Sequence, residues 1–143
     1  VILGIRYELG DLRNIGLINA RVGRQAPELI EVLKHDKLAV GDAPIIFNLG
    51  NNNTLTRTQV ADVFAEVANQ SQIIVVNTAV PRPWRDANNS LIAEYAAANP
   101  RARVVDWATI SQNHPEYFAP DGVHLRPAGI TVYVAAIMEA LNK

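Results

Sequence analysis

The chain has 143 residues, of which 49% are hydrophobic and 19% are charged, and its formal net charge is −1. This composition is typical of a globular protein, and the length suits one domain that spans residues 1–143. The near-zero charge excludes the basic surface on which nucleic-acid binding depends, and no apolar run approaches the roughly 20 residues of a membrane span.

The chain contains no cysteine, which excludes disulfides and thiolate-rich metal sites. This absence is compatible with an extracytoplasmic bacterial domain, although many cytosolic proteins also lack cysteine, and no secretion signal is visible. Because residue 1 is a valine, we expect that Val1 is not the natural start of translation.

The first element in the chain is a helix that has no visible beginning. Residues 1–9 (VILGIRYEL) have a helical pattern, but no capping residue precedes them and no strand leads into them. Residues 14–20 (NIGLINA) are a weak candidate for a strand. Pro27 then suits the first turn of a helix, whose buried stripe would be Leu29, Ile30 and Leu33.

Three clearer strands alternate with helices along the rest of the chain. Residues 44–50 (PIIFNLG), 72–77 (QIIVVN) and 101–107 (RARVVDW) are short apolar runs rich in β-branched residues, as expected for parallel strands. Thr56 and Gln59 form a capping-box pattern at the start of the helix after the first run. Helical stripes after the first two runs are Val60, Val63, Phe64 and Val67, and Leu91, Ile92, Tyr95 and Ala96. Pro127 opens the last helix, whose stripe is Ile130, Tyr133, Val134, Ile137, Met138 and Leu141.

This alternation predicts an α/β fold of three layers around a central parallel sheet, with a flavodoxin-like order of strands. In that order the first strand is central, and its neighbours would otherwise lose their backbone hydrogen bonds. We therefore expect at least one further strand upstream of Val1, so that the chain is incomplete at its N-terminus.

In open α/β sheets, ligands bind beyond the carboxyl ends of the strands, so functional residues are expected in the loops at those ends. Asp121 and His124 lie in the stretch DGVHLRP, just before the last helix. At this spacing the carboxylate can accept a hydrogen bond from Nδ1 of the histidine, which leaves Nε2 free as a base. The alternative is an ordinary polar turn that leads into a helix.

Two further residues can stabilise a developing oxyanion. Gly23 can bring its backbone N–H close to a ligand, and Asn52 can donate from its side-chain amide. As alternatives, Gly23 is a turn glycine before a helix and Asn52 is a loop or capping residue. Trp84 is either a packing residue or a ring that stacks on a sugar face at the rim of a site.

No nucleophile accompanies these groups in the sequence. The three serines are Ser71, before a strand, Ser90, in a helix, and Ser111, in a loop, and none has the setting of an activated nucleophile. A metal site made by His114, Glu116, Asp121 and His124 is a less favoured alternative, and we expect neither a metal ion nor a cofactor.

Taken together and in order, the segments VGRQ, LGNNN and DGVHL resemble the sequence blocks of the SGNH hydrolase superfamily. More narrowly, VILGIRYEL, ARVGRQ, VNTAVPRPW, VVDW and DGVHLRPAG are similar to the extracytoplasmic domain of bacterial peptidoglycan O-acetyltransferases, which follows an integral-membrane acyltransferase domain. The resemblance covers nearly the whole chain. The combination of motifs is specific, although each motif alone is not.

The resemblance implies a catalytic serine immediately before Val1, in a Gly-Asp-Ser turn that would begin the first helix. It further implies that Asp121 and His124 complete a triad, and that Gly23 and Asn52 form the oxyanion hole. Asn51 stands where the family often has threonine, and it joins Trp84 as a candidate substrate-binding residue.

The implied activity is transfer of acetyl to a glycan hydroxyl of the cell wall, the C6 hydroxyl of N-acetylmuramic acid, by an enzyme at the cell surface. Its partners would be an acetyl donor and a glycan acceptor. The alternatives are a secreted esterase of carbohydrates or small esters, and a catalytically silent glycan-binding module. A Gly-rich phosphate loop is missing, which argues against a nucleotide ligand.

Overall fold

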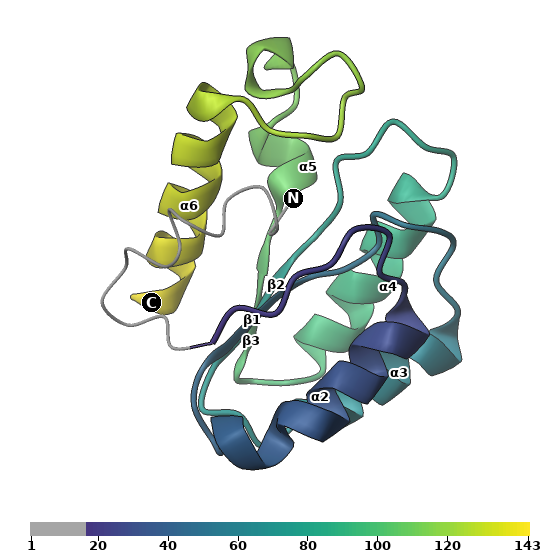
Figure 1. The fold of residues 1–143 in the computed structure, drawn as a ribbon, viewed down its shortest axis with the longest axis vertical. Helices are drawn as coiled ribbons and strands as arrows, with labels where there is room; N and C mark the ends of the chain where they lie inside the picture. Colours follow the sequence, from purple (N-terminus) through teal and green to yellow (C-terminus); the bar gives the residue numbers. More distant parts are fainter. Residues whose placement is uncertain (1–16) are drawn as a thin grey trace.

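The computed structural model describes residues 17–143, which form an open parallel sheet with helices on both faces (Figure 1). The elements in chain order are α2 (Ala26–Val40), β1 (Ile45–Asn48), α3 (Arg57–Glu66), β2 (Ile73–Val76), α4 (Arg85–Ala97), β3 (Ala102–Val105), α5 (Trp107–Ile110), the 3₁₀ turn η2 (Pro115–Tyr117) and α6 (Pro127–Leu141).

The sheet has the order β1-β2-β3, and both neighbouring pairs are parallel. Ile45 pairs with Ile73, and Ile73 in turn pairs with Ala102. Each strand lies inside its predicted run and is shorter than it. β2 is buried along its whole length, as its continuous apolar sequence predicts, whereas β1 and β3 are partly exposed because each has only one neighbour among the described strands.

Two apolar cores, one on each face of the sheet, give the fold its three layers. On one face, α2, α3 and α4 pack against alternate residues of β1 and β2, including Phe47, Ile73 and Val75. On the other face, α6 covers Ile74 and Val76. Figure 1 shows α6 on one side of the strands and α2, α3 and α4 on the other. The predicted three-layer α/β fold is confirmed.

The helices α2, α3 and α6 begin where the sequence predicts. The hydroxyl of Thr56 accepts a hydrogen bond from the Gln59 N–H at 3.1 Å, and the Gln59 side chain accepts from the Thr56 N–H at 3.0 Å. This reciprocal pair satisfies two backbone donors that would otherwise lack partners at the start of α3. Pro27 and Pro127 both lie in the first turn of their helices, where proline removes no intrahelical hydrogen bond.

The two elements predicted for the N-terminal part lie partly or wholly outside the described residues. The helix expected at residues 1–9 and residues 14–16 of the weak strand lie outside the described residues. Residues 17–20, the rest of that candidate strand, have no strand structure, so the prediction is wrong for them. Among these four residues, Ile18 and Ala20 are partly buried, whereas Leu17 is 58% exposed. The segment thus alternates between partly buried and exposed residues without pairing with a described strand.

The strand predicted at residues 101–107 ends at Val105, and Trp107 begins α5 instead. Asp106 caps this helix, because its carboxylate accepts hydrogen bonds from the Thr109 N–H at 3.1 Å and the Thr109 hydroxyl at 2.7 Å. An N-cap aspartate stabilises a helix start, so the chain turns out of the sheet here. Trp107 is only 2% exposed and packs edge-on against Tyr133 of α6, with ring centroids 5.0 Å apart.

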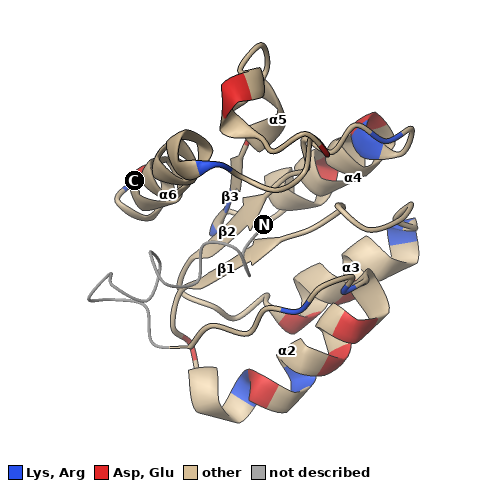
Figure 2. Cartoon of the chain, turned by 45° about the horizontal axis from the view of Figure 1, so that its top comes forward, with Lys and Arg blue, Asp and Glu red and all other residues tan. Residues whose placement is uncertain are grey.

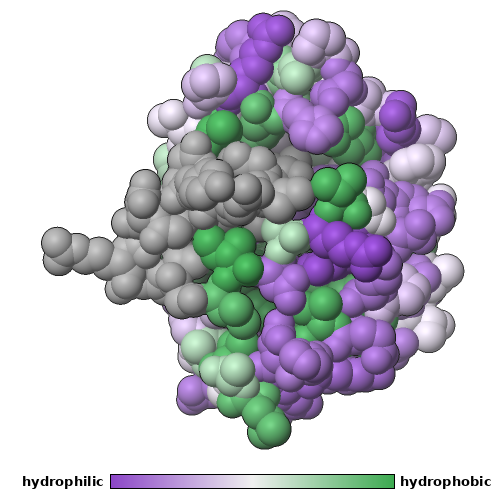
Figure 3. Space-filling model, viewed as in Figure 1, coloured by the Kyte–Doolittle hydropathy of each residue, from purple (hydrophilic) through white to green (hydrophobic). Residues whose placement is uncertain are grey.

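The surface of the described part is mixed in charge and in hydropathy. Figure 2 shows acidic and basic residues interspersed on α2, and Figure 3 shows apolar patches within a largely hydrophilic surface. The exposed large apolar side chains are Leu17, Val22, Leu38 and Ile110. Within residues 17–143, no helix combines the length and the apolar character that crossing a bilayer requires.

Candidate active site

The loop that carries Asp121 and His124 is closed like a hairpin. Phe118 and Leu125 form an antiparallel bridge, the Ala119 N–H donates to the His124 carbonyl at 2.8 Å, and the Arg126 N–H donates to the Tyr117 carbonyl at 2.8 Å. The loop therefore has its own backbone hydrogen bonds and leads directly into α6.

Packing fixes the base of this loop. Gly129, in the first turn of α6, lies against Tyr117, and a Cβ at this position would come within 2.3 Å of the Tyr117 carbonyl oxygen. Tyr117 and Phe118 contact the buried Trp107 ring, at centroid distances of 6.1 and 6.0 Å. A rigid aromatic support of this kind holds the loop in one place relative to the sheet.

Asp121 and His124 are hydrogen-bonded to each other, as their spacing predicts. Nδ1 of His124 lies 2.5 Å from Oδ2 of Asp121. Oδ1 of Asp121 accepts the backbone N–H groups of Val123 at 2.9 Å and His124 at 3.0 Å. The His124 side chain and these two N–H groups hold the pKa of Asp121 well below its usual range. An ionised carboxylate on Nδ1 orients the ring and leaves Nε2 available to accept a proton.

Gly122 fits between this pair and the loop after β2. Its φ is +68°, a left-handed conformation that glycine adopts without strain, and a Cβ would lie 3.1 Å from Cγ of Pro81. The close approach brings the Asp121–His124 loop against the loop that carries Trp84. The two loops are separated by 40 residues in the sequence, but they meet at the carboxyl edge of the sheet.

Gly23 lies in the turn before α2 with a φ of +72°, so its backbone needs glycine, although the space around it is open. Its N–H donates no hydrogen bond to another residue within the described range 17–143. The amide of Asn52 lies beside this turn, because its Nδ2 donates to the Arg24 carbonyl at 3.1 Å. A primary amide has two N–H groups, so this contact orients Asn52 and leaves one donor for another acceptor.

A cleft of about 380 Å³ brings four of the predicted residues together. Gly23, Asn51, Asn52 and Trp84 all line it, and Val123 closes it next to His124. The remaining lining residues, which the sequence did not single out, are Gln25, Asn53, Val80 and Arg82. Amides, an indole ring and one guanidinium suit a polar, hydroxyl-rich ligand, since each can donate hydrogen bonds or stack on a sugar ring.

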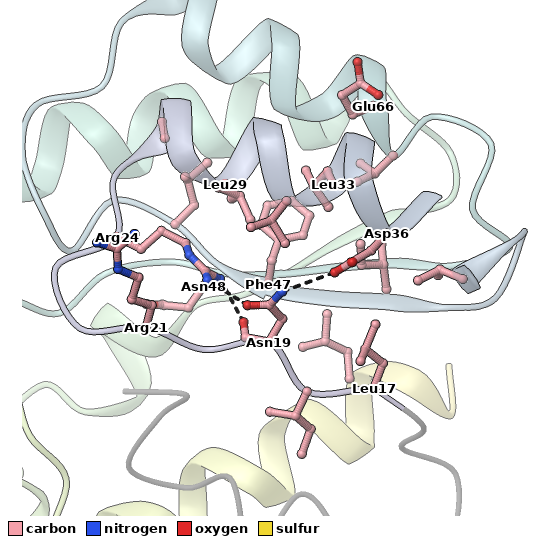
Figure 4. A pocket seen from close by; sticks show the side chains of 18 of the residues that line it. Leu17, Asn19, Arg21, Arg24, Leu29, Leu33, Asp36, Phe47, Asn48 and Glu66 are labelled. Atoms are coloured by element: carbon pink, nitrogen blue, oxygen red, sulfur yellow. Dashed lines mark hydrogen bonds between the residues drawn. The ribbon is translucent and has the colours of Figure 1, made fainter. Parts of the chain in front are cut away.

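His124 lines a second, larger hollow of about 1150 Å³, which also includes Gly23 and Asn52 and continues along β1. Figure 4 shows Leu29 and Leu33 of α2 and Phe47 of β1 around this hollow, and Asn19 hydrogen-bonded to both Arg24 and Asp36. Asp121 lines neither hollow and is hydrogen-bonded to His124, which lines the larger one. His124, Gly23 and Asn52 thus line the same hollow, and Gly23 and Asn52 also line the smaller cleft.

The three serines of the chain, Ser71, Ser90 and Ser111, make hydrogen bonds with other parts of the chain. The hydroxyl of Ser90 donates to the Asp86 carbonyl at 3.0 Å, and that of Ser111 donates to the Trp107 carbonyl at 2.6 Å. The Ser71 N–H donates to the Asp42 carbonyl at the opposite end of β2. None of the three lines either hollow.

The alternative metal site does not form in the described part of the chain. His114 is 2.8 Å from the Glu116 carboxylate and stacks on Tyr117, whereas His124 contacts Asp121. Among residues 17–143 there is no group of three or more side chains that could hold a metal ion.

Several bacterial proteins are similar to this chain in sequence. A peptidoglycan O-acetyltransferase of Listeria monocytogenes is 39% identical over 127 residues, which are 88% of this chain and 20% of the relative. A Bacillus subtilis protein, provisionally named a peptidoglycan O-acetyltransferase, is 35% identical over 126 residues, 87% of this chain and 20% of the relative. A Staphylococcus aureus protein, provisionally named an O-acetyltransferase, is 34% identical over 128 residues, 88% of this chain and 21% of the relative.

The chain is homologous to a segment of the bacterial peptidoglycan O-acetyltransferases. The predicted resemblance to peptidoglycan O-acetyltransferases is therefore confirmed. The chain spans about a fifth of the length of these relatives. No protein-family profile matches it.

Proposed function

We propose that this chain is the catalytic part of an O-acetyltransferase that modifies peptidoglycan at the cell surface. The observation that carries the proposal is the hydrogen-bonded Asp121–His124 pair beside a cleft that also holds Gly23, Asn52 and Trp84. The names of the homologues point to the same activity. The acceptor is a glycan hydroxyl, which we assign to C6 of N-acetylmuramic acid from the family resemblance.

The first half-reaction forms an acetyl-enzyme. His124 takes the proton from the hydroxyl of a serine immediately upstream of Val1, and the serine oxygen attacks the carbonyl carbon of the acetyl donor. The tetrahedral oxyanion accepts hydrogen bonds from the N–H groups of Gly23 and of the serine turn and from the free N–H of Asn52. The donor oxygen then leaves with the proton from His124.

The second half-reaction transfers the acetyl group. The glycan hydroxyl gives its proton to His124 and attacks the acetyl-enzyme, and the serine oxygen leaves and recovers that proton. In this proposal Trp84 stacks on the sugar, and Asn51 donates to its hydroxyls, because both residues line the cleft next to the oxyanion donors. No cofactor or metal ion enters either step.

Hydrolysis is a second reaction of the same acetyl-enzyme. The His124 side chain is 72% exposed, so water can reach the position from which the sugar attacks. We therefore expect esterase activity on small acetyl esters in the absence of glycan. A secreted esterase and a silent glycan-binding module are the alternatives that an activity assay separates from the transferase.

The relatives are about five times as long as the segment that matches this chain. We propose that this chain is likewise part of a longer protein with an integral-membrane acyltransferase domain, which tethers this part outside the cytoplasm and supplies acetyl groups. The acetyl donor and the glycan are the partners of the site, and nucleic acid is not.

Acetyl transfer to a defined glycan tests the proposal. The protein with its natural upstream sequence is incubated with 4-nitrophenyl acetate and a muroglycan oligosaccharide, and the glycan is analysed by mass spectrometry. We expect an acetylated glycan with the wild type, none with His124→Ala, and none with an acceptor that lacks the C6 hydroxyl. If the protein hydrolyses the ester but transfers no acetyl at any glycan concentration, it is an esterase. If it catalyses neither reaction, it is a glycan-binding module.

A further inference from the structure

Two adjacent asparagines in α4 contact both loops that form the walls of the cleft. Asn88 is completely buried and Asn89 is half-buried. Neither lines the cleft itself, and neither belongs to the motifs that indicated a function. A buried amide requires hydrogen-bond partners, and these two side chains find theirs on the backbone after β1 and after β2.

Asn88 holds the loop that carries the oxyanion candidate Asn52. Its Nδ2 donates to the Gly50 carbonyl at 3.0 Å and to the Asn53 carbonyl at 2.9 Å, and its Oδ1 accepts the Leu55 N–H at 2.8 Å. Both N–H groups of the amide are used, so the loop is closed around one side chain. The two residues between the contacted carbonyls are Asn51 and Asn52.

The side chain of Asn88 is closely packed against the loop after β1. Gly50 has a φ of +98°, and a Cβ there would lie 3.3 Å from Cβ of Asn88 and 3.2 Å from Cγ2 of Thr78. Gly50, which follows β1, therefore packs closely against the side chains of Asn88 in α4 and of Thr78 after β2. A larger residue at position 50 would disturb both the packing and the hydrogen bonds of Asn88.

Asn89 holds the other wall in a different way. Its Oδ1 accepts the Thr78 N–H at 3.0 Å, and its Nδ2 donates to the Thr78 carbonyl at 2.8 Å. One side chain thus pairs with both backbone groups of a single residue, as a neighbouring strand would. Thr78 is the second residue after β2, and the loop continues from it to Arg82 and Trp84, which line the cleft.

We propose that Asn88 and Asn89 are positioning residues, and that each holds a different wall of the cleft. The inference rests on the proposed function for its kinetic consequences. Asn88 fixes the oxyanion wall, which serves the formation of the acetyl-enzyme. Asn89 fixes the wall with Trp84, which serves the acceptor sugar.

The two residues should therefore have different kinetic signatures. A small displacement of an oxyanion donor weakens interactions made in the transition state, so it lowers kcat and leaves KM unchanged. A displacement of the Trp84 wall weakens binding of the acceptor, so it raises the acceptor KM and shifts the acetyl-enzyme toward hydrolysis. If the two residues had a purely structural role, their substitution would lower the amount of active enzyme. It would change neither KM nor the ratio of acetyl transfer to hydrolysis.

The test compares Asn88→Asp and Asn89→Asp in the protein with its natural upstream sequence. Aspartate keeps the shape and the accepting oxygen but loses the amide donors to the loop carbonyls. Asn99→Ala is the matched control, because Asn99 lies just after α4, at its other end. Within residues 17–143 its side chain makes one hydrogen bond, which it accepts from the nearby Arg101 N–H at 2.9 Å. Asn88→Ala is a second variant at the fully buried position.

We expect Asn88→Asp to lower kcat for 4-nitrophenyl acetate by roughly 10- to 100-fold with KM within about twofold of wild type. We expect Asn89→Asp to keep the hydrolytic kcat within about threefold and to lower the ratio of transfer to hydrolysis by roughly tenfold, because only the acceptor wall has moved. The same loss for both variants in both reactions, or wild-type kinetics for Asn88→Asp, would overturn the inference.

Hydrogen exchange followed by NMR tests the same contacts without any turnover. In the wild type, the amides of Leu55 and Thr78 should exchange slowly, because each donates to an asparagine side chain. In Asn88→Ala the amide of Leu55 should exchange faster, while the amide of Thr78 stays protected. In Asn89→Asp the amide of Leu55 should stay protected. Fast exchange of the Leu55 amide in the wild type would contradict the inference, even if no Asn88 variant folds. If both amides are protected but the wild type is inactive, only the proposed function is contradicted.

Discussion

Replacing Asp121 with Asn tests the proposed acid–base pair with little disturbance of its loop. The new carbonyl oxygen can still accept the N–H groups of Val123 and His124, which lie 2.9 and 3.0 Å from Oδ1 in the wild type. The amide nitrogen must then face Nδ1 of His124, at the position where Oδ2 lies at 2.5 Å. The opposite rotamer would direct the amide N–H groups at two backbone donors.

A donor that faces Nδ1 forces the proton of a neutral imidazole onto Nε2. In this tautomer His124 cannot take a proton from the nucleophile, and the ion pair that stabilises the imidazolium is also lost. The expected fall in kcat is about 10⁴-fold, by analogy with the same change in a serine protease, which corresponds to about 5 kcal/mol of transition-state stabilisation.

The assay is hydrolysis of 4-nitrophenyl acetate under conditions that saturate the enzyme, together with thermal unfolding. The melting temperature of Asp121→Asn should stay close to that of the wild type, because the loop keeps its backbone hydrogen bonds. His124→Ala combined with Asp121→Asn should be no slower than His124→Ala alone, since the two residues act as one unit. A rate near that of the wild type, or independent effects of the two substitutions, would refute the role given to Asp121.

Three further substitutions have defined outcomes. Asn52→Ala should lower kcat by roughly 10²–10³-fold with little change in KM, and a change confined to KM would make Asn52 a binding residue instead. Tyr133→Phe should leave the free energy of unfolding unchanged or raise it by about 1 kcal/mol, because the buried hydroxyl has no hydrogen-bond partner within residues 17–143, and a clear loss of stability in urea denaturation would reveal one. Asp106→Ala should lower the free energy of unfolding by about 2 kcal/mol, because α5 loses its N-cap and the buried amide of Asn77 loses the carboxylate that lies 2.8 Å away. An unchanged midpoint of urea denaturation would contradict this.

The strands and the long helices were predictable because local patterns decide them. β2 is a continuous apolar run, which is the pattern that burial on both faces requires. The capping box at Thr56 depends on residues only three apart, and Pro127 suits only the first turn of a helix. The short helix α5 was missed because the apolar run before it continues into Trp107, although Asp106 was a visible N-cap signal.

The site was predictable in part, for a similar reason. The pair Asp121 and His124 is local in sequence, so its spacing alone predicts the hydrogen bond. Arg82 was not singled out, although it lies beside Trp84 in a strand-end loop, which is the signal that could have found it. The contacts of Asn88 and Asn89 join residues 11 to 38 positions apart, so only the packing of α4 against the sheet reveals them.

In the proposed mechanism, His124 and Asp121 activate a serine immediately upstream of Val1. Labelling the protein, with its natural upstream sequence, by a sulfonyl fluoride and locating the label by tandem mass spectrometry tests this most directly. We expect a single label on that serine, which disappears in His124→Ala while the fold is kept. A folded wild-type protein that takes up no label, or that is labelled equally well in His124→Ala, would contradict it.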